Sequence, residues 1–342
     1  MVQVDIRIKE SAIVRPAEET PKKSIWSSNL DLLVPIVHVP TIYFYKPATF
    51  FKCGGVCLGV GLHHILGDGT SAIHFINSWS EIARGLSVTT PPFIDRTLLD
   101  ARVPPVPAMH HVEYDPVPPL NTHISGDQTP EIQSNPEPTC AKILTITFDQ
   151  LRTLKNKSRK DVADGSTINY STFETLAAHI WQCTCKARGI TNDQATKLHI
   201  PTDGRSRLNP PLPAGYCLSG EIQSKPLVDT IAKIRGALKR MDNEYLRSAI
   251  DYLQLIQADL EALKRGPHTF KSPNLNIVSW MTMPIYDADF GWGRPYFMGP
   301  AIVGFEGMAY IARCPNNDGS LMIFTCLESN HMELFKKFFY DF

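Results

Sequence analysis

The sequence predicts an α/β protein in which strands and helices alternate on both sides of a proline-rich segment. Apolar stretches with strand character are interleaved with stretches of helical spacing. Residues 101–138 hold nine of the 27 prolines, and proline disfavours packed elements. A chain of 342 residues is long for one core and suits two domains. We therefore expect an N-terminal domain at 1–100, a crossover linker at 101–140 and a C-terminal domain at 141–342.

Before the linker, the residue pattern predicts three strands and one helix. The strands are rich in β-branched and aromatic residues or alternate between apolar and polar positions. The helix has apolar residues at helical spacing, with Thr70 or Ser71 as the expected N-cap and Gly85 as the stop. The expected elements are strands at 1–10, 41–46 and 50–64 and a helix at 70–84.

After the linker, the pattern continues to alternate. The segment 226–266 is mostly helical, with Gly266 as its stop, and an amphipathic helix closes the chain. The expected strands are 142–150, 197–203, 276–285, 301–314 and 320–329. The expected helices are 149–158, 169–189, 226–266 and 332–342.

The overall composition argues against several classes of partner. The formal net charge is zero and the pI is about 7.2, which favours neither a nucleic-acid nor an anionic-membrane partner. There is no apolar run long enough to span a membrane and no secretory signal at the N-terminus. Eight cysteines are scattered without a CxxC pair, as expected for buried thiols in a reducing cytoplasm.

The stretch VGLHHILGDG (60–69) carries the most chemical information. It brings His63, His64 and Asp68 to a glycine-containing turn between a strand and a helix. An accessible histidine there titrates near neutral pH and suits general-base work, whereas Asp68 is expected to brace the turn. One alternative is that the histidine is an ordinary core or surface residue. Another is a zinc site formed by His63, His64 and Asp68, which is disfavoured because no further histidine follows at ligand spacing. A serine hydrolase is disfavoured because no G-x-S-x-G is present.

A second motif, DFGWG, comprises Asp289, Phe290, Gly291, Trp292 and Gly293. HxxxD followed by a distant DFGWG resembles the plant BAHD acyl-CoA-dependent acyltransferases. Further strings, among them TDGRSRL and MDNEYLRSAIDYL, are similar to the hydroxycinnamoyltransferases of that family that act on shikimate or quinate. The resemblance covers nearly all of the chain. It implies two chloramphenicol-acetyltransferase-like domains of mixed sheet plus helices, joined by a long crossover loop.

The resemblance also implies a mechanism. His64 would take a proton from the acceptor hydroxyl, whose oxygen attacks the thioester of a hydroxycinnamoyl-CoA. Asp68 would hold the turn. Asp289 belongs to one of the two motifs counted as catalytic. Its expected role is nevertheless structural, through an ion pair with Arg205 or Arg207. No acyl-enzyme, metal or bound cofactor is implied, because a thioester is already activated.

The resemblance extends to the acceptor pocket and to the motif that supports it. Arg265 lies fifteen residues before Trp280, at the spacing of the arginine that holds the acceptor's carboxylate in the family. Trp280 would donate its indole N–H to the oxyanion or wall the pocket. Thr41 and Tyr43 match polar pocket positions. Asp203, Arg205 and Arg207 of TDGRSRL and residues 290–293 are implied to be structural. The resemblance further implies that the protein is a cytoplasmic monomer of phenylpropanoid metabolism. It would bind a small-molecule acceptor and no nucleic acid.

The sequence departs from the family pattern at four places. Val39 and Val278 stand where threonines are expected, which weakens the case for shikimate by on the order of 1 kcal/mol for each lost donor. A block of about a hundred residues, enough for a small domain, is missing between residues 48 and 51, so the N-terminal domain is incomplete. A strand-length segment is also missing near 213–226.

Two interpretations remain open at this point. The chain is an active hydroxycinnamoyltransferase that tolerates the losses, or a truncated paralogue, splice product or imperfect gene model that acts, if at all, as a binding or interaction protein. HxxxD and DFGWG are present in both cases. A missing supporting shell favours impaired catalysis, because catalytic groups must be held within about half an ångström.

Overall fold

The structure is a computed structural model, and a defined part of the chain is described by it. The described residues are 10–15, 19, 27–34, 37–46, 55–114, 138–160, 169–191, 194–213, 230–257, 263 and 267–342. The expectations for the first strand, Arg265, Gly266 and residues 214–229 fall outside this part. Within it, no helix is both long and apolar enough to cross a membrane.

A five-stranded mixed sheet with the order β3-β8-β7-β5-β4 organises the C-terminal half. β3, β8 and β7 are antiparallel neighbours, whereas β7, β5 and β4 run parallel. The strands are β3 (Thr139–Ile146), β4 (Leu198–His199), β5 (Leu275–Ser279), β7 (Met308–Arg313) and β8 (Leu321–Glu328). The helices on one face share a core with the strands and are α3 (Phe148–Lys160), α4 (Thr172–Ala187), α5 (Thr230–Arg240) and α9 (Ser329–Phe339).

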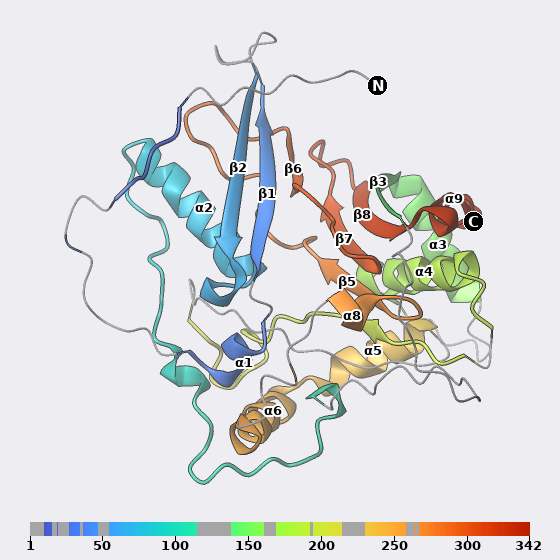
Figure 1. The fold of residues 1–342 in the computed structure, drawn as a ribbon, viewed down its shortest axis with the longest axis horizontal. Helices are drawn as coiled ribbons and strands as arrows, with labels where there is room; N and C mark the ends of the chain where they lie inside the picture. Colours follow the sequence, from blue (N-terminus) through green and yellow to red (C-terminus); the bar gives the residue numbers. More distant parts are fainter. Residues whose placement is uncertain are drawn as a thin grey trace, which may run out of the picture.

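A three-stranded antiparallel sheet brings the two halves of the chain together (Figure 1). Its order is β2-β1-β6, and β1 pairs with both neighbours. The strands are β1 (His38–Tyr45), β2 (Val56–His63) and β6 (Phe297–Pro300). β6 was not predicted, because FMGP is short and its glycine and proline read as a turn. The sheet therefore joins strands from both sides of the expected linker. The domain bounds expected from the sequence stay a prediction.

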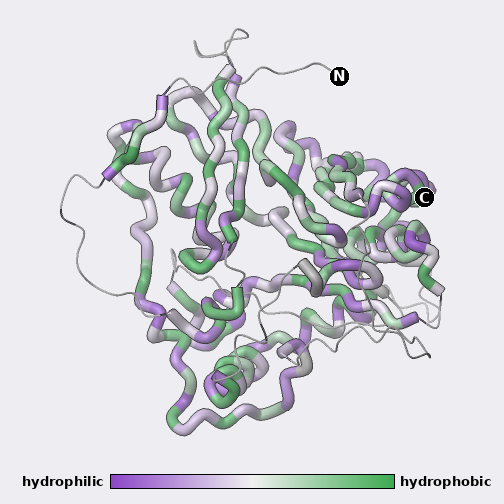
Figure 2. Tube along the Cα trace, in the orientation of Figure 1, coloured by the Kyte–Doolittle hydropathy of each residue, from purple (hydrophilic) through white to green (hydrophobic). Residues whose placement is uncertain are grey.

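A second apolar core contains residues of the small sheet, of helix α2 (Gly69–Ala83) and of strands β7 and β8. Ile73 and Ile76 on one face of α2 are buried with Tyr43 and Met298 of the small sheet. Figure 2 shows hydrophobic residues along β1, β2 and β6, where the two sheets approach each other. This arrangement brings the end of β2, and with it the histidine turn, to the boundary between the halves.

The start of the predicted linker packs on helix α6 (Asn243–Leu255) rather than running free. Asp251 accepts hydrogen bonds from the backbone N–H groups of Arg102 (2.8 Å) and Val106 (2.9 Å), and from Arg102 Nε (2.6 Å). The fully buried His111 contacts Ser248 Oγ at 2.8 Å through Nε2. Short elements nearby are α1 (Asn29–Leu32), η2 (Arg96–Leu99), η3 (Val112–Tyr114) and α8 (Pro267–Phe270).

Most predicted elements are confirmed, with shifted bounds. The helix expected over 226–266 is divided after Arg240, because Asp242 caps a new helix by accepting a hydrogen bond from the Tyr245 N–H (2.9 Å). The strand expected at 197–203 is reduced to the two residues of β4. The predicted N-cap of α2 is wrong by two or three positions, because Asp68 occupies it.

Candidate active site

The histidine turn connects β2 to α2 through a single 3-10 turn, η1 (His64–Leu66). The His64 backbone N–H donates to Val37 O at 2.9 Å, which extends the pairing of β1 and β2 into the turn. Gly67 has an extended backbone, but a Cβ there would lie 2.8 Å from Ser71 Cβ. The glycine is therefore required by close packing and not by its backbone angles.

Asp68 fixes the turn through both of its carboxylate oxygens. Oδ1 accepts from the Ser71 N–H at 2.9 Å as the N-cap of α2. The Arg205 guanidinium donates to Oδ2 at 2.8 Å and to Oδ1 at 2.9 Å, a bidentate ion pair that is largely buried on both sides. Burial by itself lowers the pKa of Arg205, but hydrogen bonds from the guanidinium to Asp68, together with the charge of that carboxylate, raise the pKa above its usual value.

A second buried arginine holds the other end of the turn. Arg96 Nη2 donates to the Leu66 carbonyl oxygen at 2.8 Å, and Arg96 Nη1 lies 3.2 Å from Asp31 Oδ2. Asp31 is fully buried and belongs to the capping box of α1 with Ser28. The turn that carries His64 is thus anchored to two different segments of the chain.

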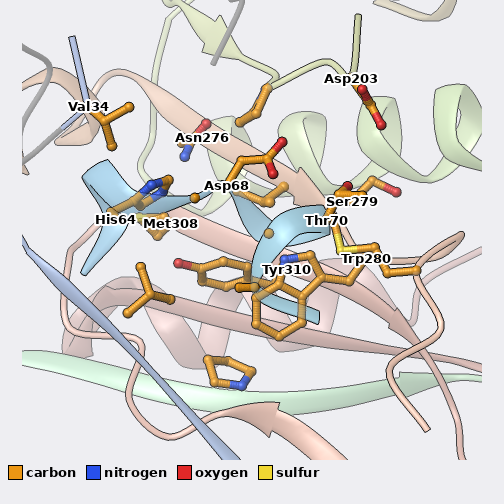
Figure 3. Close-up of a pocket in the computed structure, with 18 of the residues that line it drawn as sticks. Val34, His64, Asp68, Thr70, Asp203, Asn276, Ser279, Trp280, Met308 and Tyr310 are labelled. Atoms are coloured by element: carbon orange, nitrogen blue, oxygen red, sulfur yellow. The ribbon is translucent and has the colours of Figure 1, made fainter. Parts of the chain in front are cut away.

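His64 lies on the wall of a cavity of about 970 Å³ between the two halves (Figure 3). One wall is built from β5 and β7. In their parallel register Asn276 pairs with Met308 and Val278 pairs with Tyr310, and all four residues line the cavity. The opposite wall comes from β1, η1 and the N-terminus of α2. A cavity of this size accommodates a drug-sized ligand.

Trp280 follows β5 and closes the cavity next to α2. Its ring centroid is 5.0 Å from that of Tyr310, and its backbone N–H donates to Ile311 O at 2.8 Å. A Cβ on Gly69 would lie 3.8 Å from Trp280 Nε1 and 3.1 Å from Met283 Cε. The indole N–H is therefore held close to the N-terminus of α2, whose partial positive charge favours negative groups.

The predicted pocket residues divide into three groups. Thr41 lines the cavity, and its hydroxyl donates to Val60 O at 3.3 Å. Val39 and Val278, the two departures from the family pattern, also line it. Tyr43 is not among the lining residues: its side chain is fully buried in the core next to the cavity, and its expected contact with substrate stays a prediction.

DFGWG lies at the opposite end of α2 from His64. Asp289 Oδ1 accepts from the N–H groups of Gly291 (2.8 Å) and Gly293 (2.9 Å), and Oδ2 lies 3.6 Å from Arg84 Nη1. Both glycines have positive φ, at 97° and 84°, which the turn requires. Because α2 has 15 residues at about 1.5 Å each, its two ends are roughly 20 Å apart.

This placement overturns two expectations about Asp289. The residue pairs with Arg84, not with Arg205 or Arg207, and it is not among the residues that line the cavity. Arg205 is bound to Asp68 and Asp203, and Arg207 donates to Leu238 O and Met241 O at the end of α5. Neither arginine pairs with Asp289, so the expected partner was wrong, and the structural role of both arginines stays a prediction.

Aromatic contacts explain how DFGWG docks. Phe290 packs edge-on against Trp79 of α2 at 4.9 Å, and Trp292 packs against Tyr45 of β1 at 5.4 Å. The Tyr45 hydroxyl donates to Ala288 O at 2.8 Å. Trp292 is 38% exposed, so it anchors this loop from the surface rather than from the core.

Several cavity residues were missed by sequence reasoning. Asn276 and Tyr310 face the cavity because side chains alternate along β5 and β7, a period-2 signal that was available once the strands were assigned. Ser279, the last residue of β5, also lines the cavity although it does not follow this alternation. Among the described cysteines, burial raises the pKa of five and takes that of Cys183 to about 12, and none lines the cavity. In the described part of the chain, no group of three His, Cys, Asp or Glu residues is placed to hold a metal ion.

Known proteins resemble this chain in sequence and in fold. The sequence model of the Transferase family matches residues 4–49 and 47–342. Shikimate O-hydroxycinnamoyltransferase of Nicotiana tabacum is 43% identical over 98% of this chain and 100% of the relative. Hydroxycinnamoyl-CoA:5-hydroxyanthranilate N-hydroxycinnamoyltransferase HHT4 of Avena sativa is 37% identical over 98% and 99%. The crystal structure of vinorine synthase covers 94% of this chain and 95% of its own, with a TM-score of 0.69 and 17% identity.

Two sheets that share a cavity, with an HxxxD histidine at the end of a strand, define the class of acyl-CoA-dependent acyltransferases. The chain belongs to the BAHD family of these enzymes. The alignment with the tobacco relative has 440 positions, so about a hundred of them have no counterpart among the 342 residues here. The two matched pieces of the family model meet at residues 47–49, where the sequence indicates a missing block.

Proposed function

We propose that this chain transfers a hydroxycinnamoyl group from coenzyme A to a hydroxyl of shikimate, quinate or a related acceptor, with His64 as general base. The observation that carries the proposal is the position of His64 on the wall of the shared cavity, in a turn fixed by Arg205 and Arg96. The names of the relatives supply the acyl group and the acceptor class.

Each step of the proposed reaction has a candidate group. His64 accepts the proton of the acceptor hydroxyl, and the oxygen attacks the thioester carbonyl carbon. The Trp280 indole N–H, beside the N-terminus of α2, donates to the oxyanion that forms. The C–S bond then breaks, the proton on His64 passes to the departing sulfur, and free coenzyme A and an ester result. Asp68 acts as a positioning residue, because its carboxylate is occupied by Arg205 and Ser71.

Release of free thiol from p-coumaroyl-CoA in the presence of shikimate or quinate tests the proposal. We expect His64→Ala to reduce kcat/KM by about 10²–10⁴-fold, the usual contribution of a general base. His63→Ala is the matched control, because His63 is adjacent but packs against His38 at 5.0 Å and does not line the cavity. Equal rates for wild type and His64→Ala would reject the proposed base.

A catalytically impaired binding protein is the second candidate, and the gap at residues 47–49 favours it. A missing block removes part of the shell that holds catalytic groups in place. A folded chain that binds p-coumaroyl-CoA but releases no thiol with a panel of alcohols and amines would support this candidate over the first.

A further inference from the structure

The side-chain oxygen of Asn276 is a buried acceptor that the described part of the fold leaves without a partner. Asn276 is 2% exposed, and its side chain lines the cavity. The backbone N–H donates to Gly307 O at 2.7 Å, but the side-chain oxygen Oδ1 has no hydrogen-bond partner among the described residues. An unsatisfied buried acceptor destabilises the native state, and such groups are rare in folded proteins.

The position of Asn276 follows from the alternation along β5. Leu275 and Ile277 point into the core under the helices, whereas Asn276 and Val278 point into the cavity. Figure 3 shows Asn276 in the same cavity as His64. Asn276 therefore borders the proposed acyl-transfer site, with its unpartnered oxygen buried in the cavity wall.

Asn274, two residues earlier, shows how the same fold satisfies an amide. Its Oδ1 accepts from the Lys197 N–H at 3.0 Å, and its Nδ2 donates to Thr269 O at 3.1 Å. At Asn276 a leucine of nearly the same shape would fill the space without the cost of a buried acceptor. The contrast indicates that the partner of Asn276 is a bound molecule rather than a protein group.

We propose that Asn276 is a specificity-determining residue whose Oδ1 accepts a hydrogen bond from a hydroxyl or amine group of the bound substrate. The nature of that substrate rests on the function proposed above. A carbonyl oxygen accepts but does not donate, so it favours ligands with a hydrogen to give. Two sources carry such a group: the ring hydroxyl of a hydroxycinnamoyl thioester and the non-reacting hydroxyls of the acceptor.

Equilibrium binding, which needs no turnover, separates the two sources. One arm compares p-coumaroyl-CoA with cinnamoyl-CoA, and the other compares shikimate with a monohydroxy cyclohexenecarboxylate. We expect wild type to bind the hydroxyl-bearing member of one pair about tenfold more tightly or better. Asn276→Leu should lose that preference, and Asn274→Leu should keep it. The arm in which the preference is lost identifies the source of the hydroxyl.

Thermal unfolding of the unliganded variants gives an independent readout. Asn276→Leu should leave the Tm unchanged or raise it, because it removes an unpaired acceptor, whereas Asn274→Leu should lower it. Three results would overturn the proposal. The first is that Asn276→Leu keeps the wild-type binding preference, and the second is that Asn276→Leu lowers the Tm as much as Asn274→Leu. The third is that wild type has no preference in either arm, which would mean that solvent satisfies the amide. Failure of the proposed function is distinct, since wild type would then release no thiol although the binding preference remains.

Discussion

At the scale of single residues, the turn after β2 depends on charge pairs more than on the histidine it presents. His64 contributes the proposed chemistry, but Asp68 and Arg205 determine where its ring lies. The sequence singled out both aspartate and arginine without pairing them. Residues 68 and 205 are far apart along the chain, and no local pattern indicates which acidic group a distant guanidinium reaches.

Removal of one partner of the Asp68–Arg205 pair should destabilise the fold and slow the reaction. Asp68→Asn leaves a largely buried guanidinium without its counter-charge, so we expect the unfolding free energy to fall by about 2–3 kcal/mol and kcat to fall more than KM rises. Asp203→Asn is the control, because its side chain is 50% exposed and its pair with Arg205 should contribute under about 1 kcal/mol. Denaturant titrations and steady-state kinetics measure both effects. A smaller loss for Asp68→Asn than for Asp203→Asn would contradict this account.

Two valines on the cavity wall test the acceptor class. Val39→Thr and Val278→Thr restore the hydroxyls that the resemblance implies, and each should tighten shikimate or quinate binding by about fivefold, the equivalent of about 1 kcal/mol. Val303→Thr adds a hydroxyl elsewhere in the cavity lining and should not do so. If neither valine variant changes the KM of either acceptor, the acceptor belongs to another class.

At the scale of elements, the segment after η2 is held to α6 by the carboxylate of Asp251 and by the hydroxyl of Ser248. Desolvation by burial raises the pKa of Asp251, but hydrogen bonds from the Arg102 and Val106 backbones outweigh it and lower the pKa below 3.8. Sequence reasoning expected an unpacked linker here, since proline disfavours helices and strands. The sequence does not indicate that backbone N–H groups of this segment donate hydrogen bonds to a side chain of a distant helix.

The sign of this shift predicts acid sensitivity. Because the native pKa is depressed, the stabilisation is present above the ordinary pKa of 3.8 and is lost as the pH falls through the native value. Asp251→Asn should lower the Tm at pH 7 and make the difference from wild type shrink below about pH 4. Glu244→Gln, at the exposed second partner of Arg102, should change the Tm little. A gap between wild type and Asp251→Asn that stays constant down to pH 2 would contradict the assignment.

At the scale of the whole molecule, α2 and the turn after it present a stripe of partly exposed apolar side chains. The residues of the stripe are spaced three or four apart and are Phe75 (54% exposed), Trp79 (42%), Ile82 (59%) and Leu86 (51%). Contiguous apolar patches of this kind favour association. The stripe belongs to the half of the protein that lacks about a hundred positions present in the tobacco relative.

In contrast to the monomer that the family resemblance implies, we expect the chain to self-associate through this stripe. The double variant Phe75→Glu/Ile82→Glu should increase the monomer fraction in size-exclusion chromatography with light scattering, because charges on the stripe oppose burial. Val103→Glu is the control, because Val103 is 98% exposed and outside the stripe. An unchanged monomer fraction in the double variant would show that the stripe is not the contact.

Transcript reads across the codons for residues 48–51 would establish whether the gap is real.

The sequence by itself determined the α/β class, most strands and helices, the strand-to-helix position of His64 and the family, since each depends on local periodicity or on motifs that are contiguous in the chain. Only the tertiary structure decided that Asp68 and not Asp289 meets Arg205, that Tyr43 is sealed in a core, that β6 completes the small sheet and that Asn276 faces the cavity. These are contacts between distant segments, and their energies come from burial and pairing that exist only after the chain has folded.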